Sequence, residues 1–286
     1  MVDFSLHAVA RTLRLDVLDM TTRYGGHPSS CLSAVEILTA LYFGGVLRYR
    51  AQEPEWPERD RFILSKGHAA PLFYAVLAHA GYFDVGELQR FRELDQPYHG
   101  HPVQNTALGI EMTSGSLGQG LSFGLGQVLA TRLSGLDYRV YVLLGDGECQ
   151  EGQVWEAAMA AAHYKADRLT AIVDHNKYQQ TGPIARELSL GDFAGKWRSF
   201  GWHAEECDGH DLGALITRLQ ALRAVEGRPQ VLIAHTVKGK GVSFVEADYT
   251  FHGRPLTPEQ VELARAEILA LPSVPPVPSV SVKSGG

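Results

Sequence analysis

Cysteine is scarce in this sequence of 286 residues, which contains only Cys31, Cys149 and Cys207. Three widely separated cysteines exclude a disulfide framework and also a Cys-x-x-Cys zinc site. Disulfide-rich frameworks are typical of oxidising compartments, whereas unpaired thiols are typical of reducing ones. The cysteine pattern therefore predicts a cytoplasmic protein.

Long apolar runs are also absent. The longest, such as residues 140–144, fall far short of the roughly 20 residues that cross a bilayer. Near the N-terminus, Asp3, His7 and Arg11 interrupt the apolar positions, which indicates an amphipathic helix and not a signal peptide. We expect a soluble protein that does not associate with membranes.

Blocks of positive charge are missing as well. Lys and Arg number 26 against 32 Asp and Glu, so the formal net charge is -6. The sequence thus lacks the basic footprint of a nucleic-acid-binding protein, and any polyanion must be held by a local site. Apolar residues make up 45% of the chain, enough to bury a core, which excludes a disordered protein.

Hydrophobic periodicity divides the chain into alternating helices and strands. We expect helices over 6–20, 33–42, 71–80, 85–94, 153–164 and 212–225, and strands over 61–65, 138–144, 169–174, 203–207 and 230–234. This alternation predicts an α/β fold with a doubly wound, mostly parallel sheet and helices on both faces. Ligands of such sheets bind beyond the carboxyl ends of the strands.

Two segments do not follow this periodicity. Residues 98–120 are polar and glycine-rich without a clear element, and a stretch of that length inside a domain is usually functional. Residues 272–286 contain prolines and valines as their only apolar residues, which predicts a disordered tail. We therefore expect one domain over residues 1–271, followed by this tail.

The turn Gly145-Asp146-Gly147 directly follows the strongest predicted strand. Glycines at such a turn let backbone N–H groups approach a phosphate, but a dinucleotide fingerprint needs a third glycine where this chain has Gln150. Asp146 would repel a diphosphate unless a divalent cation lay between them. Asn176, 30 residues after Asp146 (176 − 146), ends the next strand and carries an oxygen that suits Mg²⁺. The alternative is that both residues occupy ordinary turns.

Seven short motifs rich in glycine, histidine and serine occur along residues 26–253. They are Gly26-His27-Pro28, Ser65-Lys66-Gly67-His68-Ala69, Gly100-His101-Pro102, residues 113–120 (TSGSLGQG), residues 145–152 (GDGECQEG), residues 236–241 (TVKGKG) and Phe251-His252-Gly253. Together with Asn176, these motifs resemble the thiamine diphosphate enzymes. Within that group they are similar, in the same order, to the N-terminal part of the transketolase family.

The resemblance implies a site for thiamine diphosphate and a divalent cation. Asp146, Asn176 and the backbone carbonyl of Tyr178 are expected to hold Mg²⁺ (or Ca²⁺) against the diphosphate. His68 and Gly147 are expected to contact the diphosphate itself, and Asn176 counts among the cofactor-binding residues. Gly115 and Leu117 are expected to line the cofactor pocket.

The resemblance also implies four active-site histidines, His27, His68, His101 and His252, which move protons on the hydroxyl and carbonyl oxygens of the substrate. Histidine suits this task because its unperturbed pKa of about 6.5 allows proton transfer in both directions near neutrality. Each of the four lies in a loop bounded by glycine or proline. We interpret four other histidines as structural: His7, His79, His163 and His235.

Glu151 corresponds to a family glutamate that joins a network reaching the partner's catalytic glutamate across a subunit interface. The alternative is an acidic residue favoured by the dipole in the first turn of a helix. Cys149 lies next to this segment, but no base is near it in sequence. We therefore treat Cys149 as incidental.

In this family, the acid that acts on the aminopyrimidine ring, its aromatic pocket and most sugar-phosphate-binding arginines belong to a second α/β domain, which this sequence lacks. We expect a separate C-terminal transketolase subunit to supply them, in a heterotetramer of two plus two chains; a truncated polypeptide is the alternative. The expected reaction transfers a two-carbon ketol unit from a ketose or its phosphate to an aldose or its phosphate.

Three other functions compete with this interpretation. An α subunit of a 2-oxoacid dehydrogenase would share the Gly-Asp-Gly turn and Asn176, but not residues 65–68 and 117–120. A deoxyxylulose-phosphate synthase relative would carry a Gly-His-Ser loop at residues 118–120. A non-catalytic subunit would not be expected to retain Asp146 and all four histidines.

Overall fold

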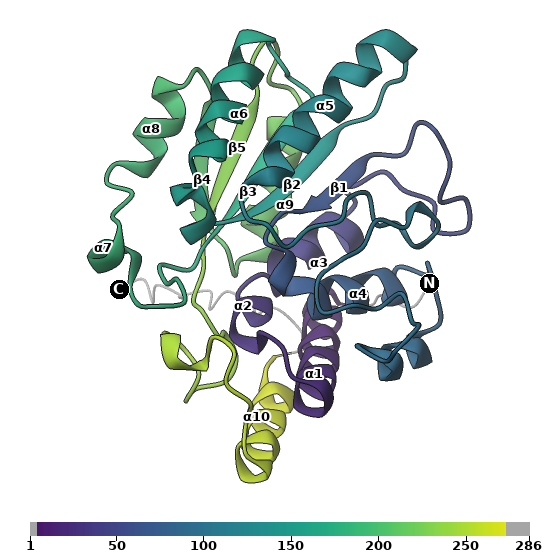
Figure 1. The fold of residues 1–286 in the computed structure, drawn as a ribbon, viewed down its shortest axis with the longest axis vertical. Helices are drawn as coiled ribbons and strands as arrows, with labels where there is room; N and C mark the ends of the chain where they lie inside the picture. Colours follow the sequence, from purple (N-terminus) through teal and green to yellow (C-terminus); the bar gives the residue numbers. More distant parts are fainter. Residues whose placement is uncertain (1–4, 273–286) are drawn as a thin grey trace, which may run out of the picture.

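Five parallel strands form one central sheet in the computed structural model, which describes residues 5–272 (Figure 1). The strands are β1 (Arg61–Leu64), β2 (Val140–Gly145), β3 (Leu169–His175), β4 (His203–Asp208) and β5 (Gln230–His235). Their order in the sheet is β1-β2-β3-β5-β4, and every neighbouring pair is parallel. Strands β2, β3 and β5 are almost entirely buried, as expected of a sheet covered on both faces.

Helices cover both faces of the sheet. They are α1 (Leu6–Tyr24), α2 (Pro28–Leu32), α3 (Val35–Phe43), α4 (Ala70–His79), α5 (Gln119–Ser134), α6 (Gly152–His163), α7 (Ile184–Glu187), α8 (Phe193–Ser199), α9 (Leu212–Leu222) and α10 (Pro258–Ala270). Side chains of α1–α4, α9 and α10 join one buried apolar cluster, and those of α5, α6 and α8 join another. The predicted doubly wound α/β fold with helices on both faces is confirmed.

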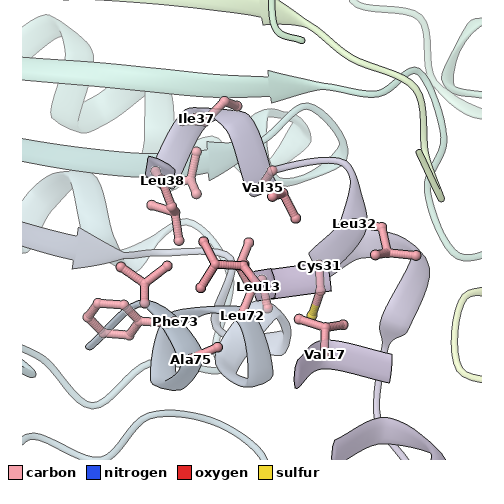
Figure 2. Packing of buried hydrophobic residues seen from close by; sticks show 14 of the residues in the cluster. Leu13, Val17, Cys31, Leu32, Val35, Ile37, Leu38, Leu72, Phe73 and Ala75 are labelled. Atoms are coloured by element: carbon pink, nitrogen blue, oxygen red, sulfur yellow. The ribbon is translucent and has the colours of Figure 1, made fainter. Parts of the chain in front are cut away.

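The apolar cluster beneath α2 fixes the segment that begins at His27. Figure 2 shows Cys31 of α2 beside Val17 of α1, with Leu72 of α4 nearby. All three side chains are fully buried, so the Cys31 thiol serves as a small apolar group. Pro28 occupies the first turn of α2, where its missing N–H leaves no hydrogen bond unmade. The packing of α2 thus sets the position of His27 immediately before it.

Several elements differ from the sequence-based expectation. The predicted helix over 85–94 is a short 3-10 helix, Val85–Arg90, and Arg92 beyond it has a left-handed backbone with φ of 61°. Helices α5, α7, α8 and α10 were not predicted. The segment 98–120 holds only the 3-10 helix Thr106–Leu108 and the first residues of α5. The predicted disordered tail lies outside the described residues, except for Pro272.

Glycines explain why the sequence pattern did not reveal α5. Leu121, Leu125 and Val128 recur at helical spacing, but three glycines among the first eight residues of α5 lower its helix propensity. A Cβ on Gly124 would lie 2.7 Å from Val142 Cγ2 of β2, so glycine allows α5 to approach the sheet closely.

None of the described helices is both long and apolar enough to cross a membrane.

Candidate cofactor and active site

Strand β2 ends in the Gly-Asp-Gly turn, and its aspartate is almost completely buried. Asp146 is 1% exposed, and its carboxylate accepts hydrogen bonds from the backbone N–H groups of Gly147 (2.8 Å) and Lys177 (2.5 Å). Among the described residues it forms no ion pair. Burial and the neighbouring charge of Asp174 raise the pKa of Asp146 to about 7. A cation beside this carboxylate would offset both effects.

The loop after β3 positions the side-chain amide of Asn176 next to the backbone of Tyr178. Asn176 donates from Nδ2 to Asp174 Oδ2 (3.2 Å) and accepts at Oδ1 from the Tyr178 N–H (3.1 Å). Lys177 between them has a left-handed φ of 72°, which turns the chain sharply. Because β2 and β3 are adjacent and parallel, Asp146 and Asn176 meet at one edge of the sheet.

These oxygens fit a hard divalent cation better than a transition metal. Among the described residues, no group of three His, Cys, Asp or Glu side chains is placed to hold a metal. The oxygens that this part of the cavity offers are the Asp146 carboxylate and the Asn176 amide. Oxygen-only coordination of this kind suits Mg²⁺ or Ca²⁺.

Three of the predicted histidines form a compact cluster. The ring centroids of His27, His68 and His252 lie 4.8 to 5.6 Å apart, although the residues come from three distant segments. His27 Nδ1 is 3.0 Å from the His252 carbonyl oxygen. Burial lowers all three pKa values, that of His252 to about 3 and that of His68 well below its usual range. The cluster is therefore neutral near pH 7.

Two buried lysines lie beneath the histidines, and the sequence analysis did not single them out. Lys66 Nζ contacts Asp174 Oδ2 (2.5 Å) and the Ser30 carbonyl (3.0 Å). Lys238 Nζ donates to Ser30 Oγ (3.0 Å) and lies 3.2 Å from His252 Nδ1. Burial and the charge of Lys66 lower the pKa of Lys238 to about 8. Both lysines lie within the motifs quoted above, and their place in those motifs was the signal that could have identified them.

Glu148 is a third buried residue of the site that the sequence did not reveal. Its Oε1 accepts hydrogen bonds from Ser65 Oγ (2.5 Å) and the Gly118 N–H (2.9 Å), and its Oε2 accepts from the Gly145 N–H (3.0 Å). It is 2% exposed, and burial raises its pKa. One carboxyl group thus ties together the end of β1, the start of α5 and the end of β2.

The remaining predicted residues lie around the opening of the site. Gly115 has a φ of 148°, and a Cβ there would lie 3.5 Å from the His101 ring. Leu117 is half-buried, whereas His101 and Glu151 are exposed. Glu151 is the N-cap residue of α6, not part of its first turn, and its side chain makes no capping hydrogen bond.

One cavity of about 430 Å³ brings all the predicted site residues together at the carboxyl ends of the strands. Its lining includes His27, His68, His101, Gly115, Leu117, Asp146, Gly147, Glu151, Asn176, Tyr178 and His252. Ser30, Lys66, Glu148 and Lys238 line it as well. One part of this cavity offers a buried carboxylate and amide, and another offers neutral imidazoles. The arrangement can hold a diphosphate with its cation and exchange protons with a second ligand.

The histidines interpreted as structural do not line this cavity. His79 Nε2 pairs with Asp16 (2.7 Å) and His235 Nε2 with Glu206 (2.8 Å). His163 is exposed at the end of α6. Cys149 is fully buried, and burial raises the pKa of its thiol well above the usual range, as expected of an unreactive cysteine.

Comparison with known proteins agrees with this geometry. The family model described as "Transketolase, thiamine diphosphate binding domain" matches residues 5–275. Among solved structures, the transketolase of Campylobacter jejuni superposes with a TM-score of 0.86 at 29% identity, covering 94% of this chain and 43% of that one.

Some relatives are named as subunits. A 6-deoxy-6-sulfo-D-fructose transketolase subunit of Clostridium sp. (strain MSTE9) is 39% identical over 260 residues, covering 91% of this chain and 94% of the relative. An apulose-4-phosphate transketolase subunit of Actinobacillus succinogenes is 40% identical over 255 residues, covering 89% of this chain and 92% of the relative.

Other relatives are longer. The Homo sapiens transketolase is 39% identical over 290 residues that make up 97% of this chain but 46% of the relative, so the chain spans about half the length of such proteins. The match is to their thiamine diphosphate-binding domain. The chain therefore belongs to the transketolase family, and it corresponds to the N-terminal, thiamine diphosphate-binding domain of that family.

Proposed function

We propose that this chain is the N-terminal subunit of a cytoplasmic two-component transketolase, with residues 1–271 as its cofactor-binding domain. It would transfer a two-carbon ketol unit from a ketose, or its phosphate, to an aldose, or its phosphate. The observation that carries the proposal is the single cavity that joins the His27, His68 and His252 cluster to Asp146 and Asn176. The three unpaired cysteines agree with a reducing compartment.

The partner would be a pyrimidine-binding C-terminal transketolase subunit, assembled as two plus two chains. The names of the two subunit relatives, which this chain matches over nine-tenths of their length, support a separate partner. Both names also specify a sugar with an anionic group, a sulfonate in one and a phosphate in the other. Glu151, which is exposed and lines the cavity, would reach that partner.

Within this chain, Asp146, Asn176 and the Tyr178 carbonyl would hold Mg²⁺ or Ca²⁺. The raised pKa of Asp146 supports this, because a buried carboxylate without a cationic partner has high affinity for a cation. Lys238, His68 and the Gly147 N–H would bind the diphosphate, and Gly115 and Leu117 would line the rest of the pocket. When bound, thiamine diphosphate supplies the electron sink for breaking a carbon–carbon bond next to a carbonyl.

The histidines would perform the proton transfers. Because burial keeps His27, His68 and His252 neutral near pH 7, each can accept a proton from a sugar hydroxyl. The resulting imidazolium can then return the proton to the carbonyl oxygen of the acceptor aldehyde. His101, exposed at the opening, would contact the substrate as it enters.

The test combines this chain with the pyrimidine-binding transketolase subunit encoded in the same genome, thiamine diphosphate and Mg²⁺. Ketose donors and aldose acceptors, with and without phosphate, are assayed for ketol transfer. We expect transfer by the pair and none by either chain alone. A pair that binds thiamine diphosphate by calorimetry but transfers nothing, or that does not bind it, would refute the proposal.

Histidine variants sharpen this test. His68→Asn and His27→Asn are expected to lower kcat of the pair by about 10² to 10⁴. His163→Asn, on the exposed surface of α6, is the matched control and should retain full activity. Equal activity of all three variants would remove the histidine cluster from the mechanism.

A further inference from the structure

A cluster of three polar side chains lies outside the cofactor cavity, where α1, α3 and the loop after β4 meet. It consists of Arg14 in α1, Glu36 in α3 and His210 in the loop. Arg14 and Glu36 are buried, and His210 is half-buried. None of the three lines the cofactor cavity, and the proposed function gives none of them a role.

Glu36 is the centre of this cluster. Its Oε1 pairs with Arg14 Nη1 (2.8 Å) and its Oε2 with Arg14 Nη2 (3.0 Å), so the carboxylate and the guanidinium form a bidentate pair. Glu36 Oε2 also lies 2.9 Å from His210 Nδ1. One carboxylate therefore joins an arginine and an imidazole from distant parts of the chain.

The hydrogen bonds of His210 define its tautomer. Nε2 accepts from the backbone N–H of Val237 (2.8 Å), so the ring proton is on Nδ1 and is donated to Glu36. Glu36 thus orients the ring, because the bond at one ring nitrogen decides what the other can do. Within residues 5–272, the Val237 N–H has no other acceptor. The imidazole therefore connects Glu36 to the backbone immediately before Lys238.

A second contact fixes the backbone after Lys238. Arg14 Nε donates to the carbonyl oxygen of Lys240 (3.1 Å), so the guanidinium that pairs with Glu36 also binds this loop. Val237 is one residue before Lys238, and Lys240 is two residues after it. The cluster thus holds the loop on both sides of Lys238.

Glycines let the cluster approach the loop at both ends. A Cβ on Gly209, next to His210, would lie 2.4 Å from Thr236 Cγ2, and one on Gly241 would lie 3.0 Å from Arg14 Nε. A larger residue at either position would push the loop and the cluster apart. The close contact is therefore a specific feature of this sequence.

The position of Lys238 needs such support. Its Nζ donates to Ser30 Oγ (3.0 Å) and lies 3.2 Å from His252 Nδ1, inside the cofactor cavity. In the part of the chain that the structure describes, Lys238 forms no ion pair, although it is 1% exposed. Water would solvate an unpaired ammonium better than this environment does. Burial therefore favours the escape of Lys238 to solvent, and contacts of the backbone must oppose it.

We propose that Arg14, Glu36 and His210 are positioning residues, which hold the backbone around Lys238 so that its ammonium stays in the cofactor cavity. The proposal rests on the function proposed above, in which Lys238 binds the diphosphate. It adds residues outside the cavity that determine the affinity for the cofactor. The two contacts on either side of Lys238 carry it.

Two variants separate the two hydrogen bonds of His210. In His210→Asn the amide can still donate to Glu36 but is too short to accept from the Val237 N–H, whereas the longer side chain of His210→Gln can accept from it. Each variant is assembled with the partner subunit and titrated calorimetrically with thiamine diphosphate and Mg²⁺ at pH 7. We expect H210N to bind the cofactor about tenfold more weakly than the wild type, and H210Q to recover most of this loss.

His203→Asn is the matched control. His203 is a half-buried histidine of β4 that pairs with Glu205 (3.2 Å), and it does not contact residues 236–241. Its cofactor affinity should equal that of the wild type. Equal affinities of H210N and H203N would overturn the proposal.

A double-mutant cycle with Lys238→Met tests whether the effect passes through Lys238. If it does, H210N lowers the cofactor affinity of the K238M pair by less than about twofold. An equal loss with and without Lys238 would show that His210 only supports the fold, which would overturn the proposal.

Arg14→Lys gives a second cycle, which decides if H210N does not fold. A lysine keeps the charge beside Glu36 but cannot form the bidentate pair and also bind the Lys240 carbonyl. R14K should weaken cofactor binding in the presence of Lys238 and change it by less than about twofold in K238M. Additive losses in R14K and K238M would contradict the proposed role of Arg14.

The titration of Lys238 in the cofactor-free chain is a readout that does not depend on thiamine diphosphate. Burial and the charge of Lys66 lower the pKa of Lys238 to about 8. In H210N the ammonium should reach solvent, and its pKa should rise toward the ordinary value of 10.5. The pH dependence of Lys238 acylation, followed by mass spectrometry, measures this shift, and an unchanged pKa would overturn the proposal.

Failure of the proposed function gives a different result. A wild-type pair that binds no thiamine diphosphate would refute that function. The acylation of Lys238 in the wild-type, H210N and H203N chains would still decide whether His210 positions this lysine.

Discussion

The ammonium of Lys66 and the carboxylate of Asp174 form a fully buried ion pair, 2.5 Å long, beneath the cofactor cavity. Lys66 follows β1 and Asp174 belongs to β3, so the pair spans the strand between them. Asp174 also accepts hydrogen bonds from Ser33 and Thr236. Although burial acts in the opposite direction, these contacts lower the pKa of Asp174, with Lys66 the largest contributor. A buried ion pair therefore supports the cofactor cavity.

Replacing Lys66 by methionine should leave Asp174 charged, buried and unpaired. We expect the free energy of unfolding to fall by about 3–5 kcal/mol, as is usual when one partner of a buried pair is removed. Urea titration of the chain measures this loss. Lys196→Met, at an exposed position of α8, is the control and should change stability by less than about 0.5 kcal/mol. A loss below about 1 kcal/mol in K66M would contradict the prediction.

Asp146→Asn should uncouple cofactor binding from the metal. In the wild-type pair, chelation of Mg²⁺ by EDTA is expected to weaken thiamine diphosphate binding by about 100-fold or more, since losing even an outer-shell partner costs about 10- to 100-fold. In D146N, EDTA should make little further difference. Fluorescence of Trp155, whose Nε1 donates to the Cys149 carbonyl beside the site, provides the signal. Glu156→Gln on the exposed surface of α6 should behave like the wild type.

Lys238 should make cofactor affinity depend on pH. Its pKa is about 8 in the cofactor-free chain, so above pH 8 the lysine must take up a proton before it can pair with a diphosphate. Affinity for thiamine diphosphate is then expected to fall by up to about tenfold per pH unit between pH 8 and 9.5. Below pH 8 the lysine is already protonated and should add no pH dependence. Calorimetric titrations across this range measure the slope.

The variant Lys238→Met should bind thiamine diphosphate about tenfold to hundredfold more weakly at pH 7 and lose this slope. Lys240→Met is the control in the same loop, where the lysine is partly exposed and pairs with Glu246. The prediction fails if K238M and K240M show the same affinity and the same pH profile.

Two glycines of α5 make a matched pair for packing. A Cβ on Gly120 would lie 2.4 Å from the side chain of Ser65, so Gly120→Ala should push α5 away from the end of β1 and cost about 1–3 kcal/mol of stability. A Cβ on Gly126 would contact nothing within 4 Å, so Gly126→Ala should stabilise the helix by up to about 1 kcal/mol. Thermal unfolding of both variants measures the difference. Equal melting temperatures for the two variants would contradict the prediction.

The position of Asp146 and Asn176 at one edge of the sheet could be predicted because it depends on topology alone. Both residues end neighbouring strands of a parallel sheet, and parallel strands bring their carboxyl ends to one edge. No comparable argument from topology predicts the histidine cluster. His27, His68 and His252 follow no periodicity, and they entered the prediction only through the resemblance to a family.

The burial of Lys66 and Lys238 could not be predicted, for a different reason. Lysine is almost never fully buried, so sequence reasoning places Lys66 and Lys238 at the surface by default. Their burial depends on Asp174, which lies 108 residues from Lys66 along the chain, and on Ser30. Such a network is visible only after the strands and helices have been assembled. Helix α5 was missed because its glycines, which allow close packing against the sheet, also lower its helix propensity.

The hydrogen-bonding contact between His27 and His252 joins positions 225 residues apart. During synthesis the ribosome releases His27 early and His252 only near the end of the domain. Strands β1, β2 and β3 are therefore synthesised before the residues that complete the pocket. Cofactor loading is expected to be a late event, which follows the docking of residues 236–252 and cannot guide the earlier steps of folding.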